Sequence, residues 1–168
     1  MKQRVGGLKS VISRASGATA DILIESGDRI VFGNRFLKAR TTPGHTIGCL
    51  SFVSDDNSFV LTGDTLLVQG CGRTDFQGGS AKTLYESVHT QLFTLSNECI
   101  VYPAHDYKGC RSTTIGVAKE TNPRLSKPLD EFVEIMANLG LSHPAKIDVA
   151  VPANRRCGVP DRLDCNSL

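Results

Sequence analysis

Three motifs in this sequence place a histidine or an aspartate directly after a short apolar segment. His45, Asp64 and His105 each follow such a segment by a few residues. Side chains at strand ends are held rigidly by the sheet, so a metal site assembled from scattered strands has this layout. Imidazole and carboxylate donors suit iron, zinc or manganese, and two histidines with one carboxylate leave positions open for dioxygen and a substrate. The sequence therefore predicts a metal site at these residues and leaves the metal open.

The two remaining histidines lie in segments of a different kind. His89 falls within a segment of helical periodicity, where a surface or boundary position is expected. His143 precedes Pro144 in a segment typical of a turn. Neither is predicted to join the metal site.

A glycine-rich segment carries the other residues with chemical potential. Gly70 and Gly72 flank Cys71, so the backbone there is able to approach a ligand closely. The guanidinium of Arg73 is suited to holding an anion. Cys71 has no adjacent histidine or other activating group, so packing or a substrate contact is a better prediction for its thiol than nucleophilic catalysis.

The elements that must position these residues begin with a series of short strands. From residue 21 to residue 64 each apolar run ends in Gly, Pro, Asn or Asp, which is typical of consecutive strands joined by turns. Residues 10–13 predict a further, buried strand. The predicted strands of the longer stretch span residues 21–24, 29–32, 35–39, 49–53 and 58–61.

Helical periodicity replaces this pattern further along the chain. Leu84, Val88 and Leu92 recur at a spacing of four residues, which predicts a helix over residues 80–93 with Ser80 as its cap. The remaining predicted elements are a strand at 99–102, helices at 115–120 and 128–139, and a strand followed by a loop at 147–154.

This order of elements predicts an α/β (α+β) domain whose large sheet has few helices to cover it. An uncovered sheet face or edge invites association. We therefore expect a partner or a further piece of chain against the sheet.

Composition limits the classes of function. The 168 residues are enough for one domain, and 40% hydrophobic with 21% charged residues is ordinary for a globular protein. A net charge of +2 gives no electrostatic reason to bind nucleic acid, and no apolar run approaches the ~18 residues that cross a membrane. The six cysteines form no CxxC pair and are predicted to be free thiols in a reducing compartment.

The motifs together resemble a known family. They occur in the same order in the persulfide dioxygenases of the ethylmalonic-encephalopathy type, which are members of the metallo-β-lactamase superfamily. The similarity runs from about residue 10 to residue 158. The motifs are Thr42-Pro43-Gly44-His45-Thr46, Thr62-Gly63-Asp64, Gly70-Cys71-Gly72-Arg73-Thr74-Asp75-Phe76, Tyr102-Pro103-Ala104-His105-Asp106-Tyr107, Asn122-Pro123-Arg124-Leu125 and Val149-Ala150-Val151-Pro152-Ala153-Asn154.

The resemblance implies an αββα sandwich and a mononuclear iron enzyme with one Fe(II) per subunit. Such an enzyme oxidises glutathione persulfide with dioxygen to sulfite and glutathione in sulfide catabolism. By the same resemblance, His45 and Asp64 match two of the three iron ligands. His105 matches the second-metal histidine of the superfamily, which in these dioxygenases lies near the iron without binding it.

The resemblance also implies roles for residues around the metal. Arg73, Asp75, Asp106 and Tyr107 are expected to shape the glutathione side of the pocket and the surroundings of the metal. Cys71 is expected among the substrate-binding residues. Groups that orient metal ligands matter to activity, so these positions are part of the predicted site.

The sequence departs from the superfamily in one motif. His-x-His-x-Asp-His, whose first histidine is the third iron ligand, does not occur in these 168 residues. We therefore expect a single domain over residues 1–168 that corresponds to the superfamily fold incomplete at its N-terminus. With two protein ligands, weak iron binding and low activity are expected.

Two other functions stay open. Thiolesterases of the glyoxalase II type share the Pro-Gly-His-Thr, Gly-Asp and Gly-Cys-Gly-Arg motifs, and hydrolyse a glutathione thiolester at a site with two metal ions. Alternatively, the chain is a non-catalytic truncated isoform that pairs with full-length subunits through its exposed sheet. Separately, a homodimer is expected as a partner arrangement.

Location follows from the family and from the first residues of the chain. The resemblance implies the mitochondrial matrix, and the cytoplasm if a transit peptide is absent. The first twenty residues are basic, rich in serine and free of acids, as in a transit peptide, but their strand pattern favours a folded segment.

Overall fold

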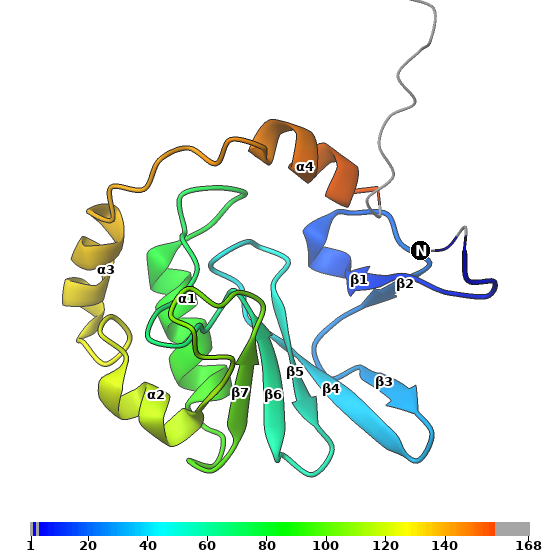
Figure 1. The fold of residues 1–168 in the computed structure, drawn as a ribbon, viewed down its shortest axis with the longest axis horizontal. Helices are drawn as coiled ribbons and strands as arrows, with labels where there is room; N and C mark the ends of the chain where they lie inside the picture. Colours follow the sequence, from blue (N-terminus) through cyan, green and yellow to red (C-terminus); the bar gives the residue numbers. More distant parts are fainter. Residues whose placement is uncertain (1, 3, 157–168) are drawn as a thin grey trace, which may run out of the picture.

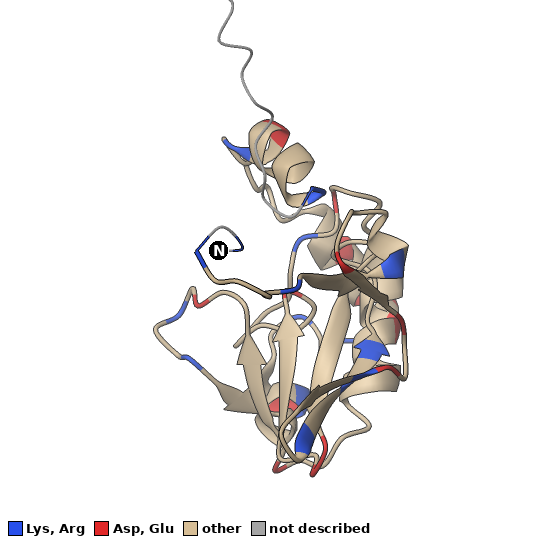
Figure 2. Cartoon of the chain, turned by 90° about the vertical axis from the view of Figure 1, so that its right-hand side faces the viewer, with Lys and Arg blue, Asp and Glu red and all other residues tan. Residues whose placement is uncertain are grey.

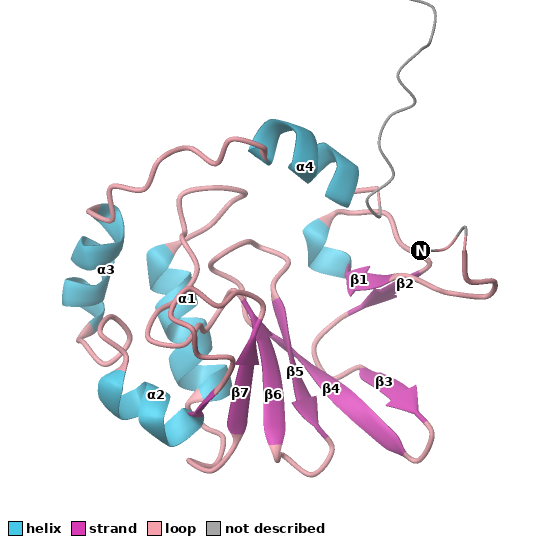
Figure 3. Ribbon diagram, viewed as in Figure 1, coloured by secondary structure: helices cyan, strands magenta, loops and turns pink. Residues whose placement is uncertain are grey.

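A mixed six-stranded sheet with helices against one face forms the body of the molecule (Figures 1 and 3). The computed structural model describes residue 2 and residues 4–156. The strands are β1 (Val11–Ser13), β2 (Ile22–Ile24), β3 (Arg29–Phe32), β4 (Arg35–Thr41), β5 (Leu50–Ser54), β6 (Phe59–Gly63), β7 (Ile100–Pro103) and β8 (Thr113–Thr114). The helices are α1 (Ala81–Ser87), α2 (Ile115–Thr121), α3 (Leu129–Ala137) and α4 (Ile147–Asn154), with a 3-10 turn η1 (Arg14–Ser16) and a π-helical turn η2 (Val88–Leu92).

The topology of the sheet brings three strand ends to one edge. The order is β3-β4-β5-β6-β7-β8, and the pairs from β3 to β6 are antiparallel. β6 and β7 are parallel, joined by a crossover that contains α1. β4 and β6 run in the same direction, because each is antiparallel to β5. The C-terminal ends of β4, β6 and β7 therefore lie along one edge of the sheet, across the strand direction. The segments that follow these three strands therefore meet there.

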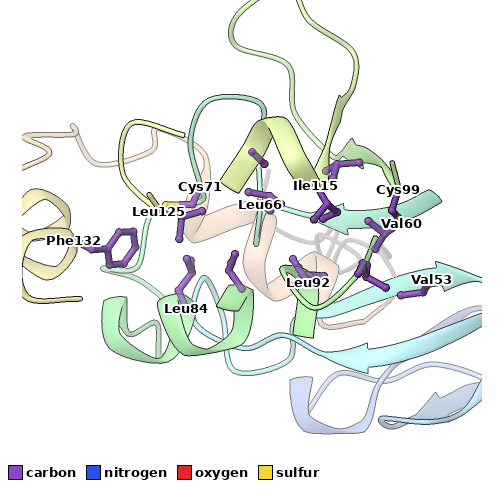
Figure 4. Close-up of a cluster of buried hydrophobic side chains, with 14 of the residues drawn as sticks. Val53, Val60, Leu66, Cys71, Leu84, Leu92, Cys99, Ile115, Leu125 and Phe132 are labelled. Atoms are coloured by element: carbon purple, nitrogen blue, oxygen red, sulfur yellow. The ribbon is translucent and has the colours of Figure 1, made fainter. Parts of the chain in front are cut away.

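The core lies between the sheet and the helices. Val53, Val60 and Val101 are paired across β5, β6 and β7 and are at most 2% exposed. Burying such side chains is the main favourable term in folding. The side chains that pack on these strands come from α1, η2, α2, α3 and the loops (Figure 4), and include Leu66, Leu84, Leu92, Ile115, Leu125 and Phe132.

The opposite face of the sheet is also apolar. Phe52, Leu61 and Tyr102 are paired across β5, β6 and β7, and Tyr102 is 42% exposed. Ile100, two residues before Tyr102, is 37% exposed. β5, β6 and β7 contain no Asp, Glu, Lys or Arg, and much of the strand ribbon in Figure 2, which views the molecule from the side of β1 to β3, is tan. This agrees with the expectation of a sheet with few helices to cover it.

Most predicted elements are confirmed, with small shifts at their ends. The strands expected at 21–24, 29–32, 35–39, 49–53 and 58–61 are β2 to β6, and those expected at 10–13 and 99–102 are β1 and β7. The expectation that β1 is buried is wrong: Val11 is 39% exposed. The helices expected at 115–120 and 128–139 are α2 and α3.

The helix expected over residues 80–93 begins as predicted and ends differently. The Ser80 hydroxyl accepts a hydrogen bond from the Thr83 amide, which is the predicted cap. After Ser87 the helix widens into the π-helical turn η2, which contains His89. His89 is half-buried, stacks on Tyr85 at 4.0 Å between ring centroids, and contacts the Leu125 carbonyl at 3.1 Å. Its expected boundary position is confirmed.

The prediction of a strand at residues 147–154 is wrong. These residues form α4, in which the Lys146 carbonyl accepts hydrogen bonds from the amides of Val149 and Ala150. The β-branched residues suggested a strand, but β propensity depends on neighbours, and none of the described strands pairs with this segment. Within residue 2 and residues 4–156, no helix is long and apolar enough to cross a membrane.

Candidate metal centre

The structure brings His45, Asp64 and His105 together at the edge where β4, β6 and β7 end. One carboxylate oxygen of Asp64, Oδ2, lies 3.5 Å from His45 Nε2. The other, Oδ1, lies 2.5 Å from His105 Nδ1. The predicted convergence of these three residues is therefore confirmed in its geometry, while their role as ligands stays a prediction.

A backbone carbonyl fixes the orientation of the His45 ring. His45 Nδ1 lies 2.6 Å from the carbonyl oxygen of Arg73, so Nδ1 carries the proton and donates it to that oxygen. Nε2 then carries the lone pair, lies 3.5 Å from Asp64 Oδ2 and is available to a metal ion. This is the arrangement in which a metal-binding histidine is held by its second nitrogen.

Gly44 allows the segment with His45 to lie against α1. A Cβ atom on Gly44 would be 2.3 Å from backbone atoms of Leu84, and its φ of +133° is a conformation that favours glycine. The Ser80 amide also donates to the Gly44 carbonyl at 2.8 Å. The start of α1 therefore sets the position of the residue before His45.

The side chains present fit one divalent ion through two donors. The Nε2 atom of His45 and the carboxylate of Asp64 face each other, and these donor types suit iron, zinc and manganese. His105 contacts the other carboxylate oxygen of Asp64 and is not placed as a third metal ligand. In the described part of the chain, no group of three or more His, Cys, Asp and Glu side chains is placed to hold a metal.

A cavity of about 530 Å³ opens beside these donors, within the roughly 300–1,000 Å³ typical of small-molecule sites. Of the predicted substrate residues, Cys71, Arg73 and Tyr107 line it. Asp75 and Asp106 are not among its lining residues. Sequence reasoning missed two further cations in the wall, Lys108 and Arg124. The only signal for Arg124 was its place in a family motif, and Lys108 had none.

Arg73 is held by the protein itself. Its guanidinium makes two hydrogen bonds to the Asp75 carboxylate, at 2.6 and 2.7 Å, and donates to the Ser142 carbonyl at 2.9 Å. The guanidinium holds the pKa of Asp75 below its usual range. These contacts fix Arg73 in the wall of the cavity, and the predicted role of both residues toward a substrate stays a prediction.

Asp106 and Tyr107 shape the loop after β7. The Asp106 carboxylate accepts hydrogen bonds from the amides of Lys108 and Cys110, which lower its pKa. Tyr107 is 75% exposed and stacks on the ring of His105 at 5.7 Å. Asp106 therefore orders the loop, and Tyr107 lies beside the imidazole that contacts Asp64.

The Cys71 thiol is buried and packed against another sulfur atom. Cys71 is 4% exposed, and its Sγ lies 3.7 Å from Sδ of Met136. Burial raises the pKa of this thiol to about 11. A thiol that stays protonated is a poor nucleophile, which agrees with the prediction of packing over catalysis.

We expect Cys71 to resist alkylation in the folded protein. At pH 8 a thiol with a pKa of about 11 is ionised in about one molecule per thousand, whereas the Cys110 side chain is exposed to the reagent. Iodoacetamide followed by peptide mass spectrometry should label Cys110 and leave Cys71 unlabelled, and urea should expose both. Equal labelling rates in the native protein would contradict this assignment.

Asn122 connects the turn after α2 to the glycine-rich segment. Its side chain is 1% exposed, and its Nδ2 donates to the Gly70 carbonyl at 3.0 Å. Its Oδ1 accepts from the amides of Arg124 and Leu125. The same segment donates from the Gly72 amide to the Asp64 carbonyl at 2.7 Å, so Asn122 supports the backbone around the candidate centre.

Asn122→Asp is expected to lower the free energy of unfolding by about 1–3 kcal/mol, the cost of leaving a buried carbonyl without its donor. Aspartate keeps an acceptor for the two amides but has no donor for Gly70. Urea unfolding measures the change. Asn138→Ala, which removes an exposed amide that donates to the Glu134 carbonyl, is the control and should cost less than about 0.5 kcal/mol. An equal loss of unfolding free energy in both variants would show that the hydrogen bond from Asn122 to the Gly70 carbonyl does not stabilise the fold.

The structure has a mixed sheet with imidazole and carboxylate side chains at its strand ends, which is the layout of a metal-binding protein. The sequence profile of the metallo-β-lactamase superfamily matches residues 3–105, and the chain belongs to this superfamily, whose members bind metal ions.

Within the superfamily, the chain is similar to persulfide dioxygenases. It is 55% identical to the mitochondrial persulfide dioxygenase ETHE1 of Homo sapiens and 54% identical to that of Mus musculus, in each case over 95% of this chain. The chain spans 63% of the length of both relatives. The crystal structure of ETHE1 from Myxococcus xanthus matches with a TM-score of 0.85 and 46% identity, over 89% of this chain and 66% of that one.

Proposed function

We propose that this chain carries the metal-binding and substrate-binding part of a persulfide dioxygenase, an oxidoreductase that uses one Fe(II) to oxidise glutathione persulfide with dioxygen. The observation that carries the proposal is the position of the Asp64 carboxylate between His45 Nε2 and His105 Nδ1 at the wall of the cavity. The 55% identity to a persulfide dioxygenase adds the class of substrate.

In this proposal His45 and Asp64 hold the iron, and the protein supplies orientation and charge. When bound, a ferrous ion supplies the electron transfer and dioxygen chemistry that side chains lack. The Arg73 carbonyl keeps the His45 proton on Nδ1, and His105 donates to Asp64 and fixes the plane of its carboxylate. The side chains of Lys108 and Arg124 give the cavity positive charge, which suits the carboxylates of a glutathione-borne substrate.

Two protein donors are fewer than the three that typically hold a catalytic metal, so we expect weak binding of Fe(II). Loss of a single partner around a metal ligand typically weakens affinity about 10–100-fold, and loss of a ligand costs more. The described residues of this chain therefore predict a low occupancy at micromolar iron.

One observation favours a second function. His105 Nδ1 lies 2.5 Å from Asp64 Oδ1, so these two side chains would be the donors for a second metal ion if one bound. A site with two ions that activates water is the arrangement of a thiolester hydrolase of the glyoxalase II type. One bound iron would therefore indicate oxygen chemistry, and two ions would indicate hydrolysis.

The test combines metal content with two assays. Because weak binding is expected, the purified chain is dialysed anaerobically to equilibrium against Fe(II), and separately against Zn²⁺, at concentrations well above micromolar, and bound metal is measured. Oxygen consumption with glutathione persulfide and hydrolysis of a glutathione thiolester are then followed. Oxygen consumption that scales with bound iron supports the dioxygenase. Hydrolysis with two zinc ions per chain supports the rival, and absence of metal binding would overturn both.

We propose the mitochondrion as the location, because the human and mouse relatives are named as mitochondrial proteins. Fractionation of cells that express the chain with a C-terminal tag tests this. Recovery in the cytosol would contradict it.

A further inference from the structure

Three buried hydroxyl groups connect the segments that follow β4 and β6. Thr42 follows β4 directly, Ser51 lies on β5, and Thr65 follows Asp64. All three residues have no exposed surface. The Thr65 hydroxyl donates to the Thr42 carbonyl at 3.0 Å and lies 3.2 Å from the Thr42 hydroxyl, which is 2.9 Å from that of Ser51.

These contacts span a gap that the sheet leaves open. β4 and β6 are separated by β5, so no ladder of backbone hydrogen bonds joins one to the other. His45 lies three residues after Thr42, and Asp64 is the residue before Thr65. The distance between the two candidate metal donors therefore depends on how their two segments are connected beyond the strand ends.

We propose that Thr65 is a positioning residue, whose hydroxyl sets the separation of His45 and Asp64 by tying the segment after β6 to the segment after β4. This inference rests on the proposed metal centre and extends it to a residue that does not touch the metal. Buried hydrogen bonds of this kind hold a unique geometry, because an unpaired carbonyl in a dry environment is costly. Metal ions require their ligands within a few tenths of an ångström.

The hydrogen bond to Thr42 also explains why a polar residue, Thr65, stands at a position with no solvent exposure. Valine has nearly the same shape and would pack equally well, so packing alone does not require a hydroxyl at position 65. Within the described part of the chain the hydroxyl bonds to one residue, Thr42, and that residue belongs to the segment of the other donor. Its effect is therefore expected to appear in metal binding as well as in stability.

The test titrates the 168-residue chain with Co²⁺ and follows the visible absorption of the bound ion. Thr65→Val removes the hydroxyl and keeps the shape, and it should weaken Co²⁺ binding about 10-fold, as loss of an outer partner does. Thr65→Ser keeps the hydroxyl and should restore affinity to within about 3-fold of the unaltered chain. Ser54→Ala removes a buried hydroxyl at the opposite end of β5, where Ser54 bonds to Phe59, and should lower stability without changing Co²⁺ affinity.

Each outcome decides the question. Unchanged affinity in Thr65→Val, equal losses in the Val and Ser variants, or an equal loss in Ser54→Ala would overturn the positioning role and leave the metal centre intact. Absence of Co²⁺ binding by the unaltered chain would overturn the metal centre itself, and the positioning role with it. If Thr65→Val does not fold, Thr65→Ala removes the same hydroxyl without adding bulk, and unchanged Co²⁺ affinity in that variant would overturn the proposal.

Discussion

Asp64→Asn should weaken divalent metal binding by about 100-fold or more, the largest effect that we expect from a single substitution. Loss of an outer partner alone typically costs about 10–100-fold, and in the proposed centre Asp64 would be a ligand itself. Asparagine has the same shape but no charge, so the fold should change little. Titration with Co²⁺ or Fe(II), monitored by the absorption of the bound ion, measures the loss.

Asp130→Asn is the matched control for this prediction. Asp130 is an exposed acid in the first turn of α3 and is not among the residues that line the cavity. Its replacement removes one negative charge from the chain and should leave metal affinity unchanged. Equal affinities for the Asp64 variant and the unaltered chain would rule out the carboxylate as a ligand.

Gly72→Ala is expected to disturb both candidate donors at once. A Cβ atom on Gly72 would lie 2.5 Å from the Asp64 carbonyl oxygen and 2.8 Å from His45 Nδ1. Backbone cannot move aside cheaply, so we expect metal affinity to fall about 10–100-fold and the free energy of unfolding to fall by about 1–3 kcal/mol. Metal titration and urea unfolding measure the two effects.

Gly70→Ala tests whether the position of the added methyl group causes these losses. Gly70 lies two residues earlier in the same segment, and a Cβ atom there would have nothing within 4 Å. Its metal affinity should stay close to that of the unaltered chain. If both alanine variants lose affinity equally, the close contact of Gly72 with His45 and Asp64 is not the reason.

Much of the fold was predictable because its signals are local. Turn residues mark the ends of β2 to β6, and Ser80 caps α1 through a contact only three residues away. The error at α4 has a different origin. Ile147 and Val149 have strand propensity, but whether a strand lies beside them depends on the tertiary structure, which a local pattern does not contain.

For the candidate metal centre, the sequence predicted the possible metal ligands but not the residues that orient them. His45, Asp64 and His105 follow apolar segments that are readable as strand ends. The contacts that orient them join residues far apart, such as the 28 positions between His45 and Arg73 and the 52 between Gly70 and Asn122. Polar side chains like Asn122 and Thr65 have many partners available in principle. Only the folded chain shows which partner each of them takes.

The parallel pairing of β6 with β7 has a consequence for folding kinetics. Asp64 and His105 are 41 positions apart, so they meet only after the crossover between the two strands has closed. Closing such a loop costs entropy before its contacts form, which delays the pairing relative to the neighbouring hairpins. The hydrogen bond from His105 to Asp64 should therefore form late in folding, and the Asp64 carboxylate should take its final orientation only at that step.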